Sequence, residues 1–193
     1  MGREERELLW KARITSGGAI LLGKNVACDA HEATRPVRVV THAHRDHIYG
    51  LSQSLRECSW VLMTEATRDL LAVLRGKDLL RHANVLGLSY GREFRFGGET
   101  IRLLRAKHII GAAQVLVEDE EGDRLLYTGD FKFPGTPVQE ADVLVMEATY
   151  GRPSQVRDFE FEVEERLVEL VERGLREGPV YIFSYHGKLQ EIM

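Results

Sequence analysis

The sequence predicts a layered α/β fold, and three observations lead to that prediction. Short segments rich in aliphatic residues, such as residues 60–63, alternate with segments of helical periodicity, such as Leu70, Leu71 and Leu74. Histidines and acidic residues stand directly after several predicted strands, as in α/β proteins whose functional groups gather at strand ends. The chain has 193 residues, which suits one domain with a sizeable core.

The composition is ordinary for a soluble globular protein and narrows the classes of function. Apolar residues make up 44% and charged residues 29%; with a net charge of −4, binding to nucleic acid would need a local basic patch. Cys28 and Cys58 form no CxxC pair, which favours two buried thiols in a reducing cytoplasm over a disulfide framework or a thiolate zinc site. We recognise no signal peptide and no membrane-spanning run, so we expect a cytoplasmic protein without a membrane partner.

The first half of the chain is expected to form a meander followed by alternating strands and helices. Glycine-containing turns separate the first three strands, and Thr64 is placed to N-cap the helix that contains Leu70. The expected strands cover residues 12–15, 19–22, 25–28, 37–41, 60–63 and 83–88, and residues 46–56 are expected to be helical.

The second half is expected to be rich in strands and to end in a long helix. Strands are expected within residues 90–98 and over residues 100–106, 115–117, 124–128 and 143–146. The longest helix is expected over residues 156–177, with one apolar face and a solvated face of charged residues. Gly178 and Pro179 then stop the helix, and a strand over residues 180–183 and a short helix over residues 189–193 are expected to follow.

The segment Thr41–His47 concentrates residues that bind metal ions. Its three histidines and one aspartate, at positions 42, 44, 46 and 47, follow the predicted strand 37–41. Neutral imidazole and carboxylate suit Zn²⁺ and similar ions. In an extended segment His42 and His44 point the same way, whereas Asp46 and His47 begin the next helix on another side, so one segment can supply two neighbouring ions. Histidines scattered over the core or surface are the weaker alternative.

Other predicted strands also deliver polar side chains at their ends. Asp29 follows the third strand, where a turn-starting aspartate is an equally good interpretation, and His108 follows strand 100–106. Asp130 and Glu147 follow the strands that end at residues 128 and 146. Because strand ends on one edge of a sheet lie together, we expect these residues to join the histidine cluster.

The segment His42–His47 resembles the HxHxDH signature of the metallo-β-lactamase superfamily, and the segments that begin at His108 and at Thr128 resemble its next two ligand motifs. The resemblance implies an αββα sandwich, with two mixed sheets between helices. It implies two zinc ions, with manganese as an alternative, and catalytic roles for Asp46 and Asp130. The implied ligands are His42, His44 and His108 for one ion, Asp46 and His47 for the other, and Asp130 as a bridge between them. In the family an aspartate like Asp29 supports the ligand histidines, and Glu147 is our second candidate for that role.

Two further segments are similar to the β-CASP branch of nucleic-acid-processing members, which includes mRNA 3′-end processing factor-like and ligase-associated exonucleases. These segments are residues 145–151 and residues 183–191. We therefore expect a metallo-β-lactamase-like domain over residues 1–178 and the start of a β-CASP-like insertion over residues 179–193. The family's last ligand histidine would lie downstream, and His186 stands at the wrong place for it. We accordingly expect an N-terminal portion, incomplete at its C-terminus, of a longer protein.

The resemblance implies a metal-dependent phosphodiesterase, expected to be an exonuclease, that hydrolyses RNA or DNA with a hydroxide activated by two metal ions. The cellular role implied for such an enzyme is RNA processing or DNA repair. Candidate contacts to the nucleic-acid backbone are Arg45, Lys107, Lys132 and Lys188, although basic residues near turns are more often simply solvated. The alternatives are a small-molecule hydrolase of the same fold, such as a thioesterase or lactonase, and a truncated, non-catalytic metal-binding module. A homo-oligomer or a missing C-terminal portion would complete the site.

Overall fold

The computed structural model describes residues 7–149, 151–152, 154 and 162–184 of the chain. These residues belong to two compact units, of which the first ends at Glu147 and the second begins at Ala148.

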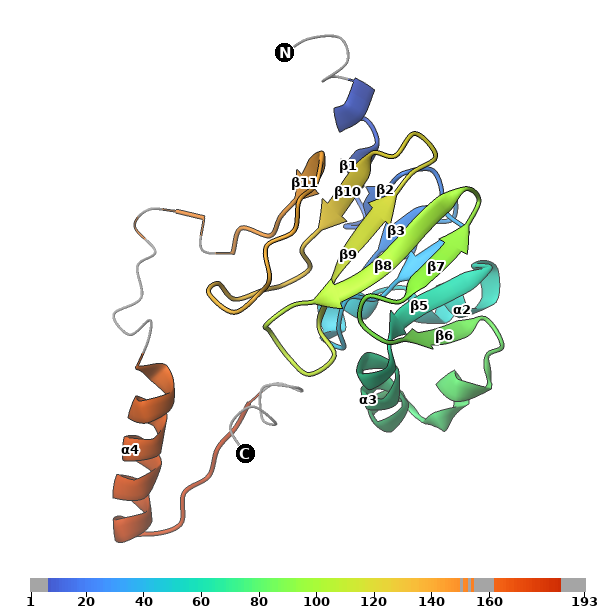
Figure 1. Ribbon diagram of the computed structural model, residues 1–193. Helices are drawn as coiled ribbons and strands as arrows, with labels where there is room; N and C mark the ends of the chain where they lie inside the picture. Colours follow the sequence, from blue (N-terminus) through green and yellow to red (C-terminus); the bar gives the residue numbers. More distant parts are fainter. Residues whose placement is uncertain (1–6, 150, 153, 155–161, 185–193) are drawn as a thin grey trace. The chain divides into compact units, whose positions relative to one another are not determined.

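The first sheet of the first unit is mixed and has six strands in sequence order (Figure 1). The second strand runs antiparallel to the first and to the third, and the third to sixth strands are parallel to one another. The strands are β1 (Ala12–Ile14), β2 (Ile20–Leu22), β3 (Val26–Cys28), β4 (Val37–Val39), β5 (Trp60–Thr64) and β6 (Val85–Leu88). The carboxyl ends of β3 to β6 therefore share one edge of this sheet.

The second sheet is also mixed, with the strand order β11-β10-β9-β8-β7. Only β10 and β11 pair in parallel, and β8 and β10 run in the same direction because both are antiparallel to β9. The strands are β7 (Glu93–Phe96), β8 (Glu99–Arg105), β9 (Ala113–Glu118), β10 (Arg124–Tyr127) and β11 (Val143–Val145). The two mixed sheets confirm the predicted fold class.

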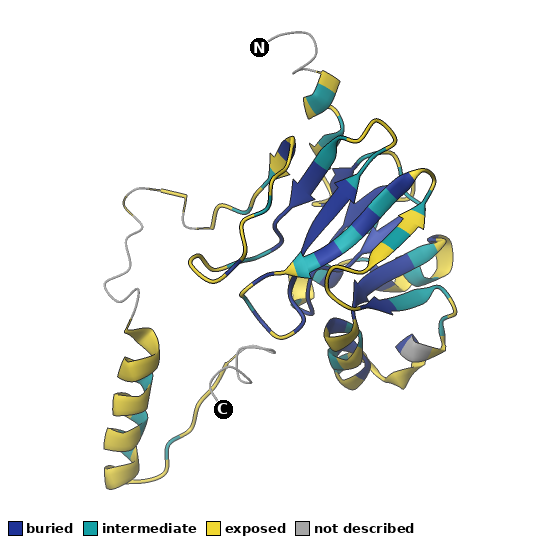
Figure 2. Cartoon of the chain, viewed as in Figure 1, coloured by how far each residue is buried: buried dark blue, intermediate teal, exposed yellow. Residues whose placement is uncertain are grey.

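The main hydrophobic core lies between the two sheets. Alternate residues of each strand face it, as the strand period of two requires. From the first sheet come Leu22, Val39 and Leu62, and from the second come Leu103 and Val115; all five have no exposed surface. The central strands are accordingly buried along most of their length (Figure 2). This core fixes the register of both sheets, because a slip of one residue would turn each apolar set outward.

Helices pack on the outer face of the first sheet, around a second core that includes Val61, Met63 and Leu71. The helical segments are η1 (Arg45–Ile48), α2 (Leu51–Glu57), α3 (Glu65–Arg75) and η2 (Lys77–Arg81). The expected N-cap is confirmed, since the Thr64 hydroxyl accepts a hydrogen bond from the N–H of Thr67 at 3.1 Å.

Residues 46–56, which were expected to be helical, are helical except at Tyr49 and Gly50, where the segment divides into two helical parts. A short 3₁₀ turn, η1, is separated from α2 by Gly50, whose φ of 70° is a left-handed conformation that ends the first helical turn. A Cβ at this position would lie 2.7 Å from the Cβ of His31, so glycine also allows the close approach of that segment. Because of the break at Gly50, the ligand segment consists of an extended part and the 3₁₀ turn η1 and is not part of a regular helix.

The carboxyl ends of β4 and β5 meet the loop that follows β8. The N–H of Ala113 donates to the carbonyl of Thr41 at 3.0 Å, and the hydroxyls of Thr64 and Thr67 donate to the carbonyl of Gly111 at 2.7 and 2.9 Å. Gly111 has a φ of 82°, and a Cβ there would lie 2.6 Å from the nitrogen of Thr67, so only glycine permits this approach. These bonds bring the edges of the two sheets together.

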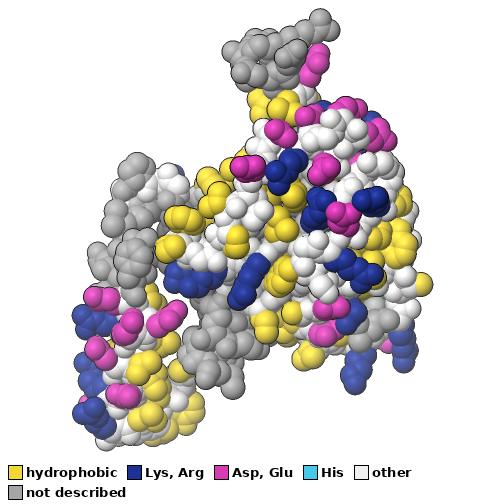
Figure 3. Space-filling view, viewed as in Figure 1, with side chains coloured by type: hydrophobic (Ala, Val, Ile, Leu, Met, Phe, Trp, Pro, Cys, Tyr) yellow, Lys and Arg dark blue, Asp and Glu magenta, His cyan; other side chains and the backbone are white. Residues whose placement is uncertain are grey.

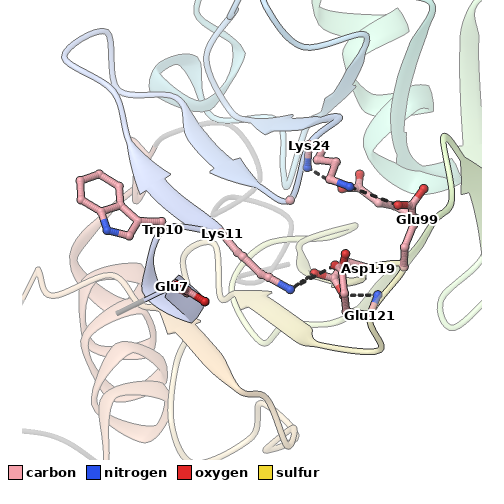
Figure 4. A pocket seen from close by; sticks show the side chains of 9 residues that line it. Glu7, Trp10, Lys11, Lys24, Glu99, Asp119 and Glu121 are labelled. Carbon is pink, nitrogen blue, oxygen red and sulfur yellow. Dashed lines mark hydrogen bonds and ion pairs between the residues drawn. The ribbon is translucent and has the colours of Figure 1, made fainter. Parts of the chain in front are cut away.

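At the opposite edge, charged side chains join the two sheets around a hollow of about 210 Å³ (Figure 4). Glu99, at the start of β8, is buried and accepts hydrogen bonds from the backbone N–H groups of Lys24 and Asn25 at 2.5 and 3.2 Å. Lys11 lies 2.6 Å from Asp119 in the β9–β10 connection. Both lysines of this hollow, Lys11 and Lys24, are paired with acids of the β9–β10 connection, so these ion pairs connect elements far apart in the sequence.

In the second unit, the described part of the expected long helix is α4 (Val163–Glu177). One side of α4 carries hydrophobic side chains and the other carries charged ones, as the sequence pattern predicts (Figure 3).

The expected strand over residues 180–183 is wrong, since this segment is irregular and pairs with no strand in the described part of the chain. Residues 156–161 and the helix expected over residues 189–193 lie outside the described residues. The domain boundary at residues 178 and 179 stays a prediction. Among the described helices, none has the length and apolar character needed to span a bilayer.

Candidate metal centre

Three histidines and one aspartate converge where β4, β8 and β10 end. The Nε2 atom of His42 lies 2.9 Å from Nδ1 of His44 and 3.8 Å from Oδ2 of Asp130. The Nε2 atom of His108 lies 3.1 Å from the same His44 nitrogen and 3.5 Å from the same Asp130 oxygen. All four atoms lie within 4.8 Å of one another. Sheet topology therefore gathers residues that are up to 88 positions apart, from His42 to Asp130.

The spacing of these four atoms fits one divalent metal ion. Four ligands held tetrahedrally at about 2.0–2.1 Å from zinc lie about 3.4 Å from one another, and the separations above lie on both sides of that value. Burial, together with the neighbouring histidines, lowers the pKa of His42 far below its usual range. His42 is therefore neutral, as an imidazole must be to bind a metal ion.

Asp130 faces a second group with its other carboxylate oxygen. Its Oδ1 lies 3.4 Å from Nε2 of His47, and that nitrogen lies 3.5 Å from Oδ2 of Asp46. Burial raises the pKa of Asp130, and the charges of Glu147, Asp46 and Asp29 add to this effect while His47 opposes it. A carboxylate that is repelled by neighbouring negative charges in this way is stabilised in its ionised form by a nearby cation. The arrangement is that expected for a bridging aspartate between two ions, although the ligand roles stay predictions.

The Asp29 carboxylate is linked by hydrogen bonds to both groups of predicted ligands, directly or through Thr41. It has a φ of 61°, a left-handed conformation that aspartate tolerates better than most residues. Its carboxylate accepts hydrogen bonds from the N–H of Thr41 at 2.8 Å and from Nδ1–H of His47 at 2.8 Å. Burial alone would lower the pKa of His47, but the hydrogen bond and charge of Asp29, with Asp130 and Asp46, raise it. The bond to Asp29 also leaves Nε2 of His47 free to face Asp130 and Asp46.

The Thr41 hydroxyl links Asp29 to His42 by hydrogen bonds and so orients the His42 ring. Its hydroxyl lies 2.8 and 2.9 Å from the two Asp29 oxygens and 3.0 Å from Nδ1 of His42. Since the carboxylate can only accept, the hydroxyl donates to Asp29 and accepts from Nδ1–H of His42. The lone pair of His42 then stands on Nε2, which faces the first group. The sequence analysis missed this role of Thr41, and its position directly before the first histidine was the only signal.

Arg38 was also missed, because it resembles any polar residue in a strand. Its side chain is fully buried beneath the ligand segment. The guanidinium donates to the backbone carbonyls of Asp29 at 2.5 Å and of His47 and Tyr49 at 3.2 Å each, and to the hydroxyl of Ser54 at 3.2 Å. Burial lowers the pKa of Arg38 and the charge of Asp29 opposes that shift, and an arginine stays charged in such a site. Arg38 therefore holds the backbone on both sides of the ligands.

The other predicted residues lie around this centre. Glu147, after β11, is half-buried and contributes to the raised pKa of Asp130; its predicted support of a ligand histidine stays a prediction. Lys107 and Lys132 are exposed, and the N–H of Lys132 donates to the carbonyl of Lys107 at 2.7 Å, so the loops after β8 and β10 are adjacent. Arg45 is exposed between two predicted ligands. Lys188 lies outside the described residues.

Comparison with known proteins places this arrangement in a family. Residues 24–176 match the beta-lactamase superfamily domain. A protein of Acidianus ambivalens described as an uncharacterized protein in the lig 3′ region is 44% identical over 110 residues, which are 56% of this chain and 79% of that protein. An RNase J-like protein of Methanocaldococcus jannaschii is 26% identical over 208 residues. That alignment covers 93% of this chain and 49% of the relative, so the chain spans about half the length of that protein.

A solved structure supports the fold alone. A metallo-β-lactamase from Cronobacter sakazakii, at 17% identity, superposes with a TM-score of 0.54 over 86% of this chain and 82% of that one. At such low identity the likeness concerns the arrangement of sheets and helices and says nothing about substrate.

Proposed function

Since this chain belongs to the metallo-β-lactamase superfamily, we propose that it is a metal-dependent nuclease that hydrolyses phosphodiester bonds of RNA or DNA. The resemblance of its motifs to this superfamily is confirmed by the domain match. The choice of a nucleic-acid substrate is supported by the RNase J-like relative, whose alignment runs over 93% of the chain. Release of nucleotides from one end of the strand is the mode we propose.

One observation carries the proposal: the two oxygens of Asp130 face two separate groups of side chains of the kinds that bind metal ions. Oδ2 faces His42 and His108, whereas Oδ1 faces His47. We propose zinc because four of the six proposed ligands are imidazoles, and manganese would accept the same mixture of nitrogen and oxygen. When bound, a pair of such ions lowers the pKa of a water molecule and offsets the charge that develops on a phosphoryl group.

The protein's own residues have distinct tasks in this proposal. Asp29 and Thr41 keep the Nδ1 protons of His47 and His42 in place, so that both rings present Nε2 to the ions. The Asp46 side chain is 79% exposed, and its carboxylate, 3.5 Å from Nε2 of His47, would orient the attacking water as well as bind the second ion. Lys107 and Lys132, exposed on adjacent loops at the same edge, would contact the phosphates of the bound strand.

The test uses three substrates with purified protein: bis-(p-nitrophenyl) phosphate, an end-labelled oligonucleotide and a thioester. We expect the first two to be hydrolysed, and we expect a loss of at least 100-fold in rate for His108→Ala. Early release of the labelled terminal nucleotide would identify an exonuclease, whereas internal fragments would identify an endonuclease. Turnover of the thioester without turnover of either phosphodiester would overturn the proposal.

A further inference from the structure

The part of the surface next to the ligand segment contains a groove that the proposed chemistry does not use. It has a volume of about 400 Å³ and lies between α2 and η2. Apolar side chains form much of it: Leu51 and Leu79 are buried, and Ile48 and Leu55 accompany them. Asn84 fixes the two walls by donating hydrogen bonds to the carbonyls at the C-terminal end of α2, at 3.2 and 2.9 Å. The groove is therefore a built feature of the fold.

The charged residues of the groove favour an anionic ligand. Arg45 and Arg75 line it, both are exposed, and no ion pair joins either to an acid within the described ranges. The acid of the lining, Asp78, is paired with Arg81 at 3.1 Å. Lysine and arginine side chains project from the end of the molecule that α3 and η2 form, as Figure 3 shows. The local charge is thus positive although the net charge of the chain is −4.

An aromatic residue stands beside these cations. Tyr49 lines the groove and is 73% exposed, so its ring is accessible to a ligand in the groove. The guanidinium of Arg38 donates a hydrogen bond to the backbone carbonyl of Tyr49. This bond holds the Tyr49 backbone in place while the ring remains accessible. Exposed aromatic rings beside arginines form the stacking platforms on which proteins bind the bases of single-stranded nucleic acid.

The position of the groove connects it to the metal centre. Arg45 lies between His44 and Asp46 in the sequence and lines the groove, so the groove begins at the ligand segment. A strand whose scissile phosphate lies at the centre can reach the groove through Arg45, the residue that the ligand segment and the groove share. We propose that the groove binds a nucleotide of a single strand next to the cleaved phosphodiester, with its base on Tyr49 and its phosphates at Arg45 and Arg75. This assignment rests on the proposed function.

Binding is measured by fluorescence anisotropy of a labelled 12-nucleotide single strand, as RNA and as DNA, in EDTA so that no cleavage occurs. We expect Tyr49→Ala and Arg75→Ala each to weaken binding at least fivefold. Arg75→Ala should also reduce the slope of log K against log salt concentration by about 0.7. The matched controls are Trp10→Ala, an aromatic that is 72% exposed at the opposite edge, and Arg92→Ala, an exposed arginine outside the groove. Both should bind as the wild-type chain does.

Each outcome bears on one proposal. Wild-type affinity in both groove variants, no binding by the wild-type chain, or equal binding of a duplex would overturn the groove assignment. Hydrolysis of bis-(p-nitrophenyl) phosphate by the wild-type chain would in those cases leave the nuclease proposal standing. Conversely, groove-dependent binding by a chain that hydrolyses no phosphodiester with zinc or manganese would overturn the nuclease proposal, and it would support single-strand binding by the groove without a cleaved bond beside it.

Discussion

Asp29 accepts a hydrogen bond from Nδ1–H of His47 at 2.8 Å, and it does so from the end of a strand 18 residues earlier. The same carboxylate receives the Thr41 hydroxyl, which in turn lies 3.0 Å from Nδ1 of His42. One buried acid therefore orients a histidine in each of the two ligand groups. This arrangement explains why an aspartate is needed here, where the backbone adopts a left-handed conformation that favours glycine or asparagine.

Asp29→Asn should weaken metal binding about 10- to 100-fold while the chain stays folded, because asparagine tolerates the left-handed conformation but supplies only one accepting oxygen. The measurement is competition for zinc with a coloured chelator, with Asp69→Asn on the exposed face of α3 as the control. Unchanged zinc affinity in Asp29→Asn would show that the histidines are oriented without this carboxylate.

Arg38→Met should lower the free energy of unfolding by about 3 kcal/mol, because the buried bond to the Asp29 carbonyl and the part-buried bonds to the His47 and Tyr49 carbonyls would be lost. Urea unfolding at fixed zinc concentration measures this. Arg35→Met is the matched control, since Arg35 is half-buried and donates to the carbonyl of Lys24 away from the ligands. Equal losses in the two variants would mean that Arg38 matters only as a buried side chain.

Glu99→Gln should destabilise the fold by about 2 kcal/mol and leave zinc binding unchanged. The carboxylate accepts from the N–H groups of Lys24 and Asn25, and an amide would turn a donor toward one of them. Urea unfolding and zinc titration of the same preparation separate the two effects. Glu120→Gln, which removes an exposed ion pair with Lys24, should change stability by less than about 0.5 kcal/mol. A loss of zinc in Glu99→Gln would contradict the separation of this edge from the metal centre.

The ion pairs of Lys11 should stabilise the fold over a defined range of pH. Burial raises the pKa of Asp119, but hydrogen bonds from Lys11 and the backbone lower it overall, whereas hydrogen bonds to Asp119 and Asp123 raise the pKa of Lys11. The aspartate's contribution is present above its unfolded pKa of about 3.9 and is lost as the pH falls through the lower folded value. The lysine's contribution is present below its unfolded pKa of about 10.4 and is lost as the pH rises through the higher folded value.

Lys11→Met should therefore reduce the free energy of unfolding at pH 7 by about 0.5–1 kcal/mol, and the difference from wild type should shrink below about pH 3. Urea unfolding at pH 7 and pH 3 gives both values. Lys77→Met, at an exposed lysine with no ion pair in the described part of the chain, should show no such difference. A difference between wild type and Lys11→Met that grew in acid would contradict the assignment.

The sequence predicted those residues of the centre whose placement depends on local alternation or on strand ends. His42 and His44 could be placed together because alternation along an extended segment is local, and His108 and Asp130 because strands ending on one edge bring their last residues together. Thr41 and Arg38 could not, because their roles depend on Asp29 and on carbonyls across the chain. The strand expected over residues 180–183 failed for the same reason: a strand forms only beside a partner, and strand propensity does not reveal whether one is present.

The two ligand groups should differ in how tightly they hold metal. The group of His42, His44, His108 and Asp130 offers four converging atoms, whereas the second group depends on an Asp46 side chain that is 79% exposed and free to turn into solvent. Asp46→Ala should therefore lose the weaker equivalent of zinc and retain the tighter one, while His108→Ala should lose the tighter one. Metal analysis after dialysis against increasing chelator measures both, with His82→Ala, a histidine outside the centre, as the control. Loss of the tighter equivalent in Asp46→Ala would mean that the exposed carboxylate, and not the group of His42, His44, His108 and Asp130, governs metal retention.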